Sequence, residues 1–156
     1  MTAKPDHQIR DDDGFEISDA RERLDMDRAF GWISRESYWA QGIPAPTFAR
    51  SVANSLSVGV YAPDGVMAGF ARVVTDRATF AWLCDVWIDA PYRGRGLGKR
   101  LVAYIDGHPD LQGLRRWMLA TKDAHSLYES VGFVTADATR DMERLDRDVY
   151  RRGAEA

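Results

Sequence analysis

Apolar positions in the first third of the chain recur three or four residues apart. This spacing predicts amphipathic helices, with Asp25 as a suitable N-cap for the first of them. Ser34 is expected to cap a short second turn that carries Tyr38 and Trp39, and the prolines of residues 41–46 predict a rigid connection. The apolar positions are Met26, Ala29, Phe30 and Ile33 in the first helix and Phe48, Val52 and Leu56 in the helix after the connection.

From residue 57 onward the pattern becomes that of strands. Residues 58–61 and 66–74 flank the turn signal Pro63-Asp64-Gly65, which predicts a hairpin. Residues 79–88 are rich in aromatic and β-branched side chains and extend this antiparallel meander. Residues 15–18 are a candidate for a short first strand.

A strand–helix–strand unit follows the meander. A helix begins near Leu97 and ends near Gly107, and residues 115–120 form the next strand, which must run parallel to residues 79–88. A short helix at residues 124–131, a strand at 133–136 and a final strand through Met142 complete the prediction. The fold class is therefore α/β of the α+β type, a mainly antiparallel sheet with one parallel crossover, flanked by helices.

Length and composition narrow the class of protein. The 156 residues fit one domain, which we place at residues 15–150 between a disordered lead-in, 1–14, and a tail, 151–156. With 21 basic and 24 acidic residues, the chain has no overall charge that would favour nucleic acid. The single cysteine, Cys84, excludes an internal disulfide, and no apolar run approaches the roughly 20 residues of a membrane span. No signal-peptide pattern is present, so we expect a soluble, cytoplasmic protein without a membrane partner.

The segment from Arg93 to Arg100 stands out in this nearly balanced sequence. Glycines 94, 96 and 98 occupy a strand-to-helix turn, and Arg93, Arg95, Lys99 and Arg100 surround them. A helix N-terminus presents N–H groups without intrahelical partners, and glycine lets an anion approach the main chain. The pattern predicts a phosphate cradle, although glycine-rich turns also serve tight packing alone. It matches neither the dinucleotide fingerprint nor the P-loop, because the glycines are wrongly spaced for both.

The turn instead resembles the GNAT superfamily of acetyl-coenzyme-A-dependent N-acetyltransferases. Residues 88–98 are similar to the family motif R/Q-x-x-G-x-G/A, with Arg93, Gly96 and Gly98 in its key positions. Residues 124–133, A-H-S-L-Y-E-S-V-G-F, are similar to the family segment A-x-x-L-Y-x-x-x-G-F. The resemblance extends over residues 15–136 and implies that the two parallel strands, the family's fourth and fifth, splay apart. One position departs from the family: Thr121 stands where many members have an asparagine that binds the pantetheine arm.

The resemblance implies acetyl-CoA as co-substrate and an amine as acceptor. Main-chain groups of the glycine turn would bind the diphosphate, and the edge of residues 86–88 would pair with the pantetheine arm. The predicted cofactor-binding residues are Val86, Trp87, Ile88, Arg93, Gly94, Arg95, Gly96, Leu97, Gly98, Lys99 and Thr121. No metal is expected, because His7 and His108 lack ligand partners at a suitable spacing.

Two catalytic roles follow from this chemistry. Tyr128 stands at the position of the family's conserved tyrosine and is the candidate acid for the departing thiolate. Asp85 interrupts an apolar strand and could bind the substrate ammonium or relay its proton, or could form an ion pair with a neighbouring element. His125 is a second candidate for proton transfer at neutral pH. Cys84 lacks an activating partner, so we interpret it as a packing residue.

The acceptor pocket is predicted from the family's usual arrangement. Tyr38, Trp39, Trp82 and His125 are the candidate substrate-binding residues, although aromatic side chains at such junctions often belong to the core. We predict acetyl transfer to a primary amine of a small molecule by direct attack in a ternary complex. The alternatives are a non-catalytic acyl-CoA-binding or regulatory module, acetylation of a protein amine and, more remotely, a nucleotide-dependent dehydrogenase. Family members are commonly homodimers, so a homodimer is compatible with the sequence.

Overall fold

The structure, a computed structural model, describes residues 5–154. In this part of the chain one sheet has the strand order β1-β2-β3-β4-β5-β6, and only β5 and β6 run parallel. The strands are β1 (Gln8–Arg10), β2 (Glu16–Ser18), β3 (Leu56–Tyr61), β4 (Met67–Thr75), β5 (Phe80–Ile88) and β6 (Arg116–Met118). The α-helices are α1 (Met26–Gly31), α2 (Ala45–Ala53), α3 (Leu97–Asp106), α4 (His125–Glu129) and α5 (Val149–Ala154).

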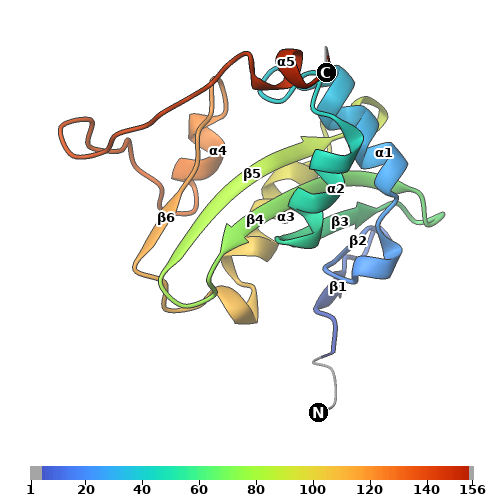
Figure 1. Cartoon of the computed structure of the whole chain (residues 1–156). Helices are drawn as coiled ribbons and strands as arrows, with labels where there is room; N and C mark the ends of the chain where they lie inside the picture. The colour runs from blue at the N-terminus through green and yellow to red at the C-terminus, as the bar shows by residue number, and fades with distance from the viewer. Residues whose placement is uncertain (1–4, 155–156) are drawn as a thin grey trace.

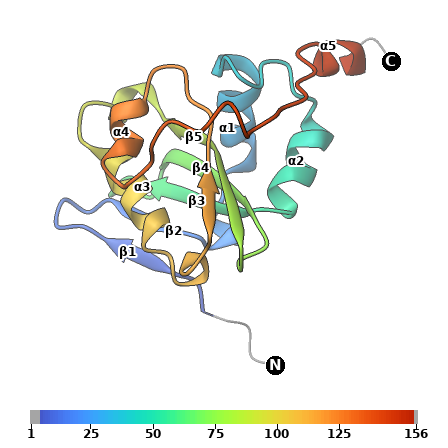
Figure 2. The same ribbon diagram turned by 90° about the vertical axis from the view of Figure 1, so that its left-hand side faces the viewer.

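Helices cover both faces of the sheet (Figures 1 and 2). α1 and α2 pack on one face around Ile33, Phe48 and Phe70, which are almost completely buried. α3 and α4 lie on the opposite face over a core that includes Val58, Val60, Leu101, Ile105 and Tyr128. Because every residue of β3 is buried, this strand lies at the centre of the layered fold.

Most of the predicted elements are confirmed. Asp25 caps α1, and its carboxylate accepts a hydrogen bond of 3.1 Å from the Arg28 N–H. α3 begins at Leu97 and ends before Gly107, and β5 and β6 form the expected parallel pair. The predicted hairpins join β3 to β4 and β4 to β5.

Four local predictions in the first helices and at the C-terminal end were wrong. α2 ends at Ala53, and Leu56 begins β3. Ser34 does not cap a turn, because it lies within a π-helical segment, η2 (Trp32–Glu36), and its hydroxyl donates to the Ile43 carbonyl over 3.0 Å.

Within the described residues no strand forms at 133–136 or through Met142. There Asp137 accepts hydrogen bonds from the Thr139 N–H and, through its carbonyl, from the Arg140 N–H, which fixes a turn instead. Val134 and Met142 are 85% and 98% exposed, so neither gains from burial in a sheet. The chain then crosses to the other side of the sheet, where α5 lies near α1 and α2 (Figure 2).

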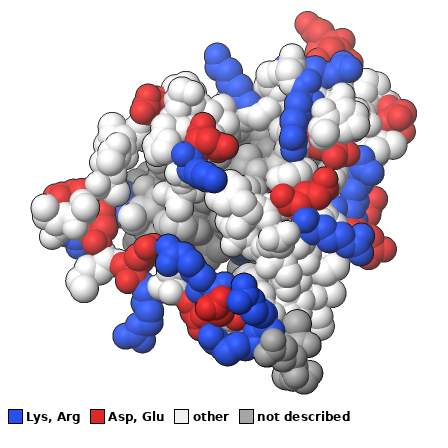
Figure 3. All heavy atoms as spheres, turned by 90° about the horizontal axis from the view of Figure 1, so that it is seen from above, with Lys and Arg blue, Asp and Glu red and all other residues white. Residues whose placement is uncertain are grey.

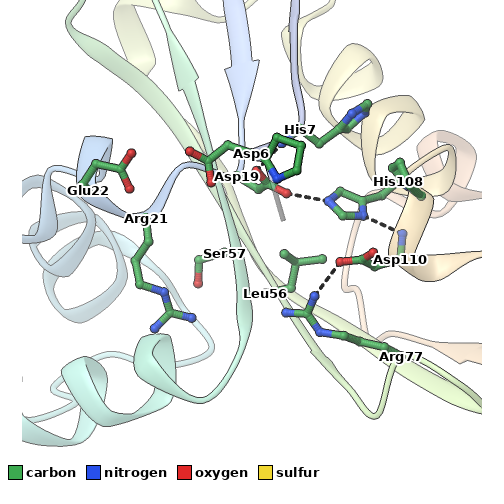
Figure 4. A pocket seen from close by; sticks show the side chains of 12 residues that line it. Asp6, His7, Asp19, Arg21, Glu22, Leu56, Ser57, Arg77, His108 and Asp110 are labelled. Carbon is green, nitrogen blue, oxygen red and sulfur yellow. Dashed lines mark hydrogen bonds and ion pairs between the residues drawn. The ribbon is translucent and has the colours of Figure 1, made fainter. Parts of the chain in front are cut away.

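The prediction of a disordered lead-in was also wrong for the described part of residues 1–14. Residues 8–10 form β1, which pairs with β2. His108 fixes this region from the end of α3: its Nε2 lies 2.7 Å from Asp19 Oδ2, and its Nδ1 accepts the Asp110 N–H (Figure 4). The other oxygen of Asp19 accepts the His7 N–H. Residues 1–4 lie outside the described part of the chain.

Candidate active site

The parallel strands β5 and β6 separate after a short paired stretch. Only Phe80, Ala81 and Trp82 of β5 pair with β6, opposite Arg116, Trp117 and Met118. β5 continues to Ile88, so its second half has no strand partner on the β6 side among the described residues. Residues 83–86 line a cavity on that side, as the predicted splay requires.

A β-bulge lies in the separated half of β5. In its pairing with β4, Arg72 is opposite Cys84 and Phe70 is opposite Trp87, so two residues of β5 face one residue of β4. Asp85 is in the bulge and has φ of 55°, a left-handed conformation that an aspartate adopts only at a cost. The bulge redirects β5 at the point where the candidate acid–base residue stands.

A cavity of about 510 Å³ opens between the separated strands. It is lined by residues from β5, from the segment between β6 and α4, from α4 and from the segment after η2. The cavity brings together most of the predicted catalytic and substrate-binding residues with part of the predicted cofactor site: Tyr38, Trp39, Trp82, Asp85, Val86, Thr121 and Tyr128.

Asp85 is buried, and each of its carboxylate oxygens has one partner. Its Oδ2 accepts a hydrogen bond of 2.9 Å from Arg72 Nε in an ion pair, and its Oδ1 accepts one of 2.8 Å from Trp39 Nε1. The sequence analysis gave an ion pair with a neighbouring element as one alternative for Asp85, and this ion pair is present. Each carboxylate oxygen can accept a second hydrogen bond, so this pairing does not exhaust Asp85.

Sequence reasoning missed Arg72. Its guanidinium also donates to the Ser55 hydroxyl over 2.9 Å, and its side chain is 17% exposed. The sequence did hold a signal for this pair. Arg72 is a charged residue in an otherwise apolar strand, and Asp85 is equally isolated in the next strand of the hairpin.

Tyr128 is buried in α4, and its ring packs against Phe133. Burial raises the pKa of Tyr128, with smaller contributions from Tyr38 and Asp123. Its hydroxyl makes no hydrogen bond within the described part of the chain, so the proton is available to a group in the cavity. Thr121 accepts the Ala124 N–H at 3.0 Å and thereby fixes the start of α4, while its own hydroxyl hydrogen remains able to donate.

The glycine turn has the conformation that glycine favours at two positions. Gly94 and Gly96 have φ of 82° and 77°, and a Cβ at either would meet open space. The Arg100 N–H donates to the Gly96 carbonyl, so the N–H groups of Leu97, Gly98 and Lys99 precede the first helical hydrogen bond. The side chain of Leu97 is buried, which leaves only its main chain for a ligand.

Two of the basic residues around the turn already have partners. Arg93 donates to the Ile88 carbonyl over 2.8 Å and lies over the Trp87 ring. Arg100 forms ion pairs of 2.7 and 2.8 Å with Asp11 and Asp13 of the β1–β2 turn. Seen from above, basic and acidic side chains are interspersed rather than separated (Figure 3).

Some predicted residues lie away from the cavity between the strands. His125 is exposed and lines a second cavity of about 260 Å³ with Phe133 and Thr135. The side chain of Trp87 packs against the α1–α2 core, so only its main chain belongs to the β5 edge.

Among the described residues no group of three or more metal-ligating side chains is present, and no helix has the length and hydropathy to span a bilayer.

Comparison with known proteins decides the family. The GNAT acetyltransferase domain family matches residues 54–135, which include β3, β4, β5, the glycine turn and Tyr128. The chain belongs to the GNAT family of acetyltransferases. This assignment accounts for the sheet with a splayed parallel pair and for both motifs that the sequence resembles.

Individual relatives agree with this GNAT assignment. A crystal structure from Xanthomonas campestris pv. campestris, assigned to the GNAT family as an acetyltransferase, is 40% identical, with a TM-score of 0.84 over 87% of this chain and 96% of that one. An uncharacterized ycf52-like N-acetyltransferase of Prochlorococcus marinus is 32% identical over 68% of this chain and 57% of that protein. The ribosomal-protein-S18-alanine N-acetyltransferase of Escherichia coli is 25% identical over 79% of each chain, with a TM-score of 0.63. The chain spans about three-fifths of the length of the curated relatives it matches.

Proposed function

We propose that this protein transfers an acetyl group from acetyl-CoA to a primary amine of a small molecule, by direct attack in a ternary complex. The observation that carries the proposal is the cavity between β5 and β6, where Asp85 and Tyr128 line the same space beside an unpaired strand edge. Its volume, about 510 Å³, is within the usual range for small-molecule sites.

The residues around the cleft fit acetyl-CoA. The N–H groups at the start of α3 and the open space at Gly94 and Gly96 suit a diphosphate, with Arg95 and Lys99 supplying positive charge. The unpaired edge of β5, at Val86, Trp87 and Ile88, suits the amide-containing pantetheine arm. Arg93 keeps its predicted place in the cofactor site, and the bond from its Nε to the Ile88 carbonyl also supports the turn. When bound, acetyl-CoA supplies an acetyl group activated as a thioester.

The side chains of the cavity divide the proton transfers between them. Asp85 receives the ammonium of the acceptor and takes its proton, directly or through water, so that a neutral amine can attack. Tyr128 gives its proton to the sulfur as the carbon–sulfur bond breaks and the carbon–nitrogen bond forms. Its raised pKa keeps the hydroxyl protonated at neutral pH, which an acid requires.

The environment of Cys84 supports direct attack over an acetyl-cysteine route. Burial raises the pKa of the Cys84 thiol to about 12, so a nucleophilic thiolate is scarce at neutral pH. Its sulfur lies 3.5 Å from the Arg72 carbonyl, a contact that suits a thiol donor.

Release of free thiol from acetyl-CoA across a panel of primary amines tests the proposal. We expect turnover in the wild type and a loss of about 100-fold in Tyr128→Phe. Tyr150→Phe is the matched control, because it removes a phenolic hydroxyl from α5, outside the cavity. Asp85→Asn should lower turnover or acceptor affinity, and unchanged values for both would remove Asp85 from the chemistry.

Two results, from this assay combined with a titration of acetyl-CoA and with peptides added to the panel, would contradict the proposal. Binding of acetyl-CoA without turnover on any amine would indicate a non-catalytic binding module. Turnover restricted to peptides with free amino termini would indicate a protein substrate.

A further inference from the structure

The segment between η2 and α2 holds two aromatic side chains outside the core. Tyr38 and Trp39 are 56% and 40% exposed, although both are large and partly apolar. Hydrogen bonds fix the segment around them: the Ser37 hydroxyl donates to the Ile33 carbonyl and accepts the Ala40 N–H, and the Gly42 N–H donates to the Ser34 carbonyl. The two rings are therefore held in place by a rigid segment.

One ring is bonded to β5 and the other to the segment that follows β6. The Trp39 indole donates to Asp85 of β5 over 2.8 Å, and the Tyr38 hydroxyl accepts the Lys122 N–H, between β6 and α4, over 3.0 Å. The rings contact each other edge to face, with centroids 5.0 Å apart. We call this pair the Tyr38–Trp39 clasp, because it spans the cleft where β5 and β6 no longer pair.

Two charged groups near the clasp have partners. Arg72 neutralises Asp85, and the Lys122 ammonium lies 5.5 Å from the centre of the Tyr38 ring. Asp123, the other acidic residue lining the cavity, is exposed. An acceptor with a second positive charge at the clasp would meet the ammonium of Lys122.

We propose that the clasp makes the site selective for primary amines whose remaining part is a single aromatic or similarly flat apolar group without further charge. This proposal rests on the proposed function and goes further by naming the acceptor class. The aromatic group lies against Tyr38, Trp39 and Trp82, and the amine reaches Asp85, whose position is fixed by Trp39. Trp39 is thus both a wall of the pocket and a positioning residue for Asp85.

Calorimetric titration of amines in the presence of coenzyme A tests this inference without requiring turnover. We expect 2-phenylethylamine to bind at least tenfold more tightly than 1,4-diaminobutane. The comparison keeps one primary amine and replaces an aromatic ring by a second charge. Equal affinities, or a preference for the diamine, would overturn the inference.

Variants of Trp39 test whether the clasp causes the preference for the aromatic amine. Trp39→Phe keeps an aromatic wall but removes the N–H that holds Asp85, so phenylethylamine binding should weaken several-fold while its advantage over the diamine persists. Trp39→Ala should remove most of that advantage. Tyr150→Phe should change neither value, and melting curves confirm that each variant is folded. An unchanged advantage in Trp39→Ala would contradict a role for the clasp.

The thiol-release assay separates this inference from the proposed function. Aromatic selectivity in binding with no thiol release would refute the enzyme and support the acceptor class. Thiol release with equal kcat/KM for both amines would support the enzyme and overturn the acceptor class.

Discussion

Asp85 shows most clearly what single residues contribute to the site. Its left-handed backbone is held by the Arg72 ion pair and the Trp39 hydrogen bond, which together offset a conformational cost of about 1–2 kcal/mol. The sequence identified Asp85 as unusual because it interrupts an apolar strand. The sequence could not predict the bulge, because the residues of β5 up to Cys84 fit a regular strand whose side chains alternate between the two faces.

Residues whose conformation or position follows from a local motif were easier to place. Gly94 and Gly96 have positive φ as a glycine-rich turn suggests, whereas Gly98 lies inside α3 and needs no special conformation. Tyr128 lines the cavity as its motif indicated. The partners of these residues come from distant segments, and no local pattern specifies them.

The pH dependence of turnover tests the acid role of Tyr128. Because burial raises its pKa above the ordinary value near 10, the proton-donating form persists through mildly alkaline pH. We expect kcat for the wild type to show no loss between pH 7 and about pH 10, the range in which Tyr128 stays protonated. The measurement is steady-state thiol release at saturating amine, and a fall in kcat with an apparent pKa below about 9 would contradict the assignment.

Replacement of Cys84 by alanine tests direct attack. The thiol with its pKa raised to about 12 has no chemical role in the proposed reaction. We expect kcat/KM of Cys84→Ala to remain within about threefold of the wild type, because only packing is changed. A loss of about 100-fold or more, with acetyl label trapped on the wild-type protein, would favour a covalent intermediate.

At the scale of elements, the short contact between β5 and β6 creates the site. The sequence predicted that these strands run parallel, because a crossover helix separates them. It did not predict how few residues pair, since residues 115–120 read as one strand while only Arg116–Met118 form it. The predicted strands beyond α4 failed for a related reason, because turn hydrogen bonds and exposed apolar residues leave that segment irregular.

His108 joins elements that are far apart in the sequence. Its side chain is only 2% exposed and links the end of α3 to Asp19 after β2. We expect His108→Ala to lower the free energy of unfolding by about 2–4 kcal/mol, because Asp19 would lose a buried partner. Urea unfolding measures this loss, and His125→Ala on the exposed face of α4 is the control, with a change within about 0.5 kcal/mol. Equal effects of the two variants would contradict the linking role.

At the scale of the whole molecule, the layered fold brings the glycine turn and the cavity between β5 and β6 to the same splayed strand. β5 contributes its edge and Asp85, and the turn follows it directly. The sequence predicted this arrangement through strand periodicity and two motifs. It misjudged the N-terminal segment, because β1 and the Asp11–Asp13 turn are held by contacts with β2 and with Arg100, which come from other parts of the chain.

Calorimetric titration of acetyl-CoA into the wild type, Gly96→Ala and Gly31→Ala tests the central claim most directly. Gly96 has φ of 77° at the start of α3, whereas Gly31 has φ of −57° and open space around a Cβ, so it is a matched control. The account predicts saturable binding to the wild type, at least tenfold weaker binding to Gly96→Ala and unchanged binding to Gly31→Ala. Absence of binding to the wild type, or equal affinities in all three proteins, would contradict it.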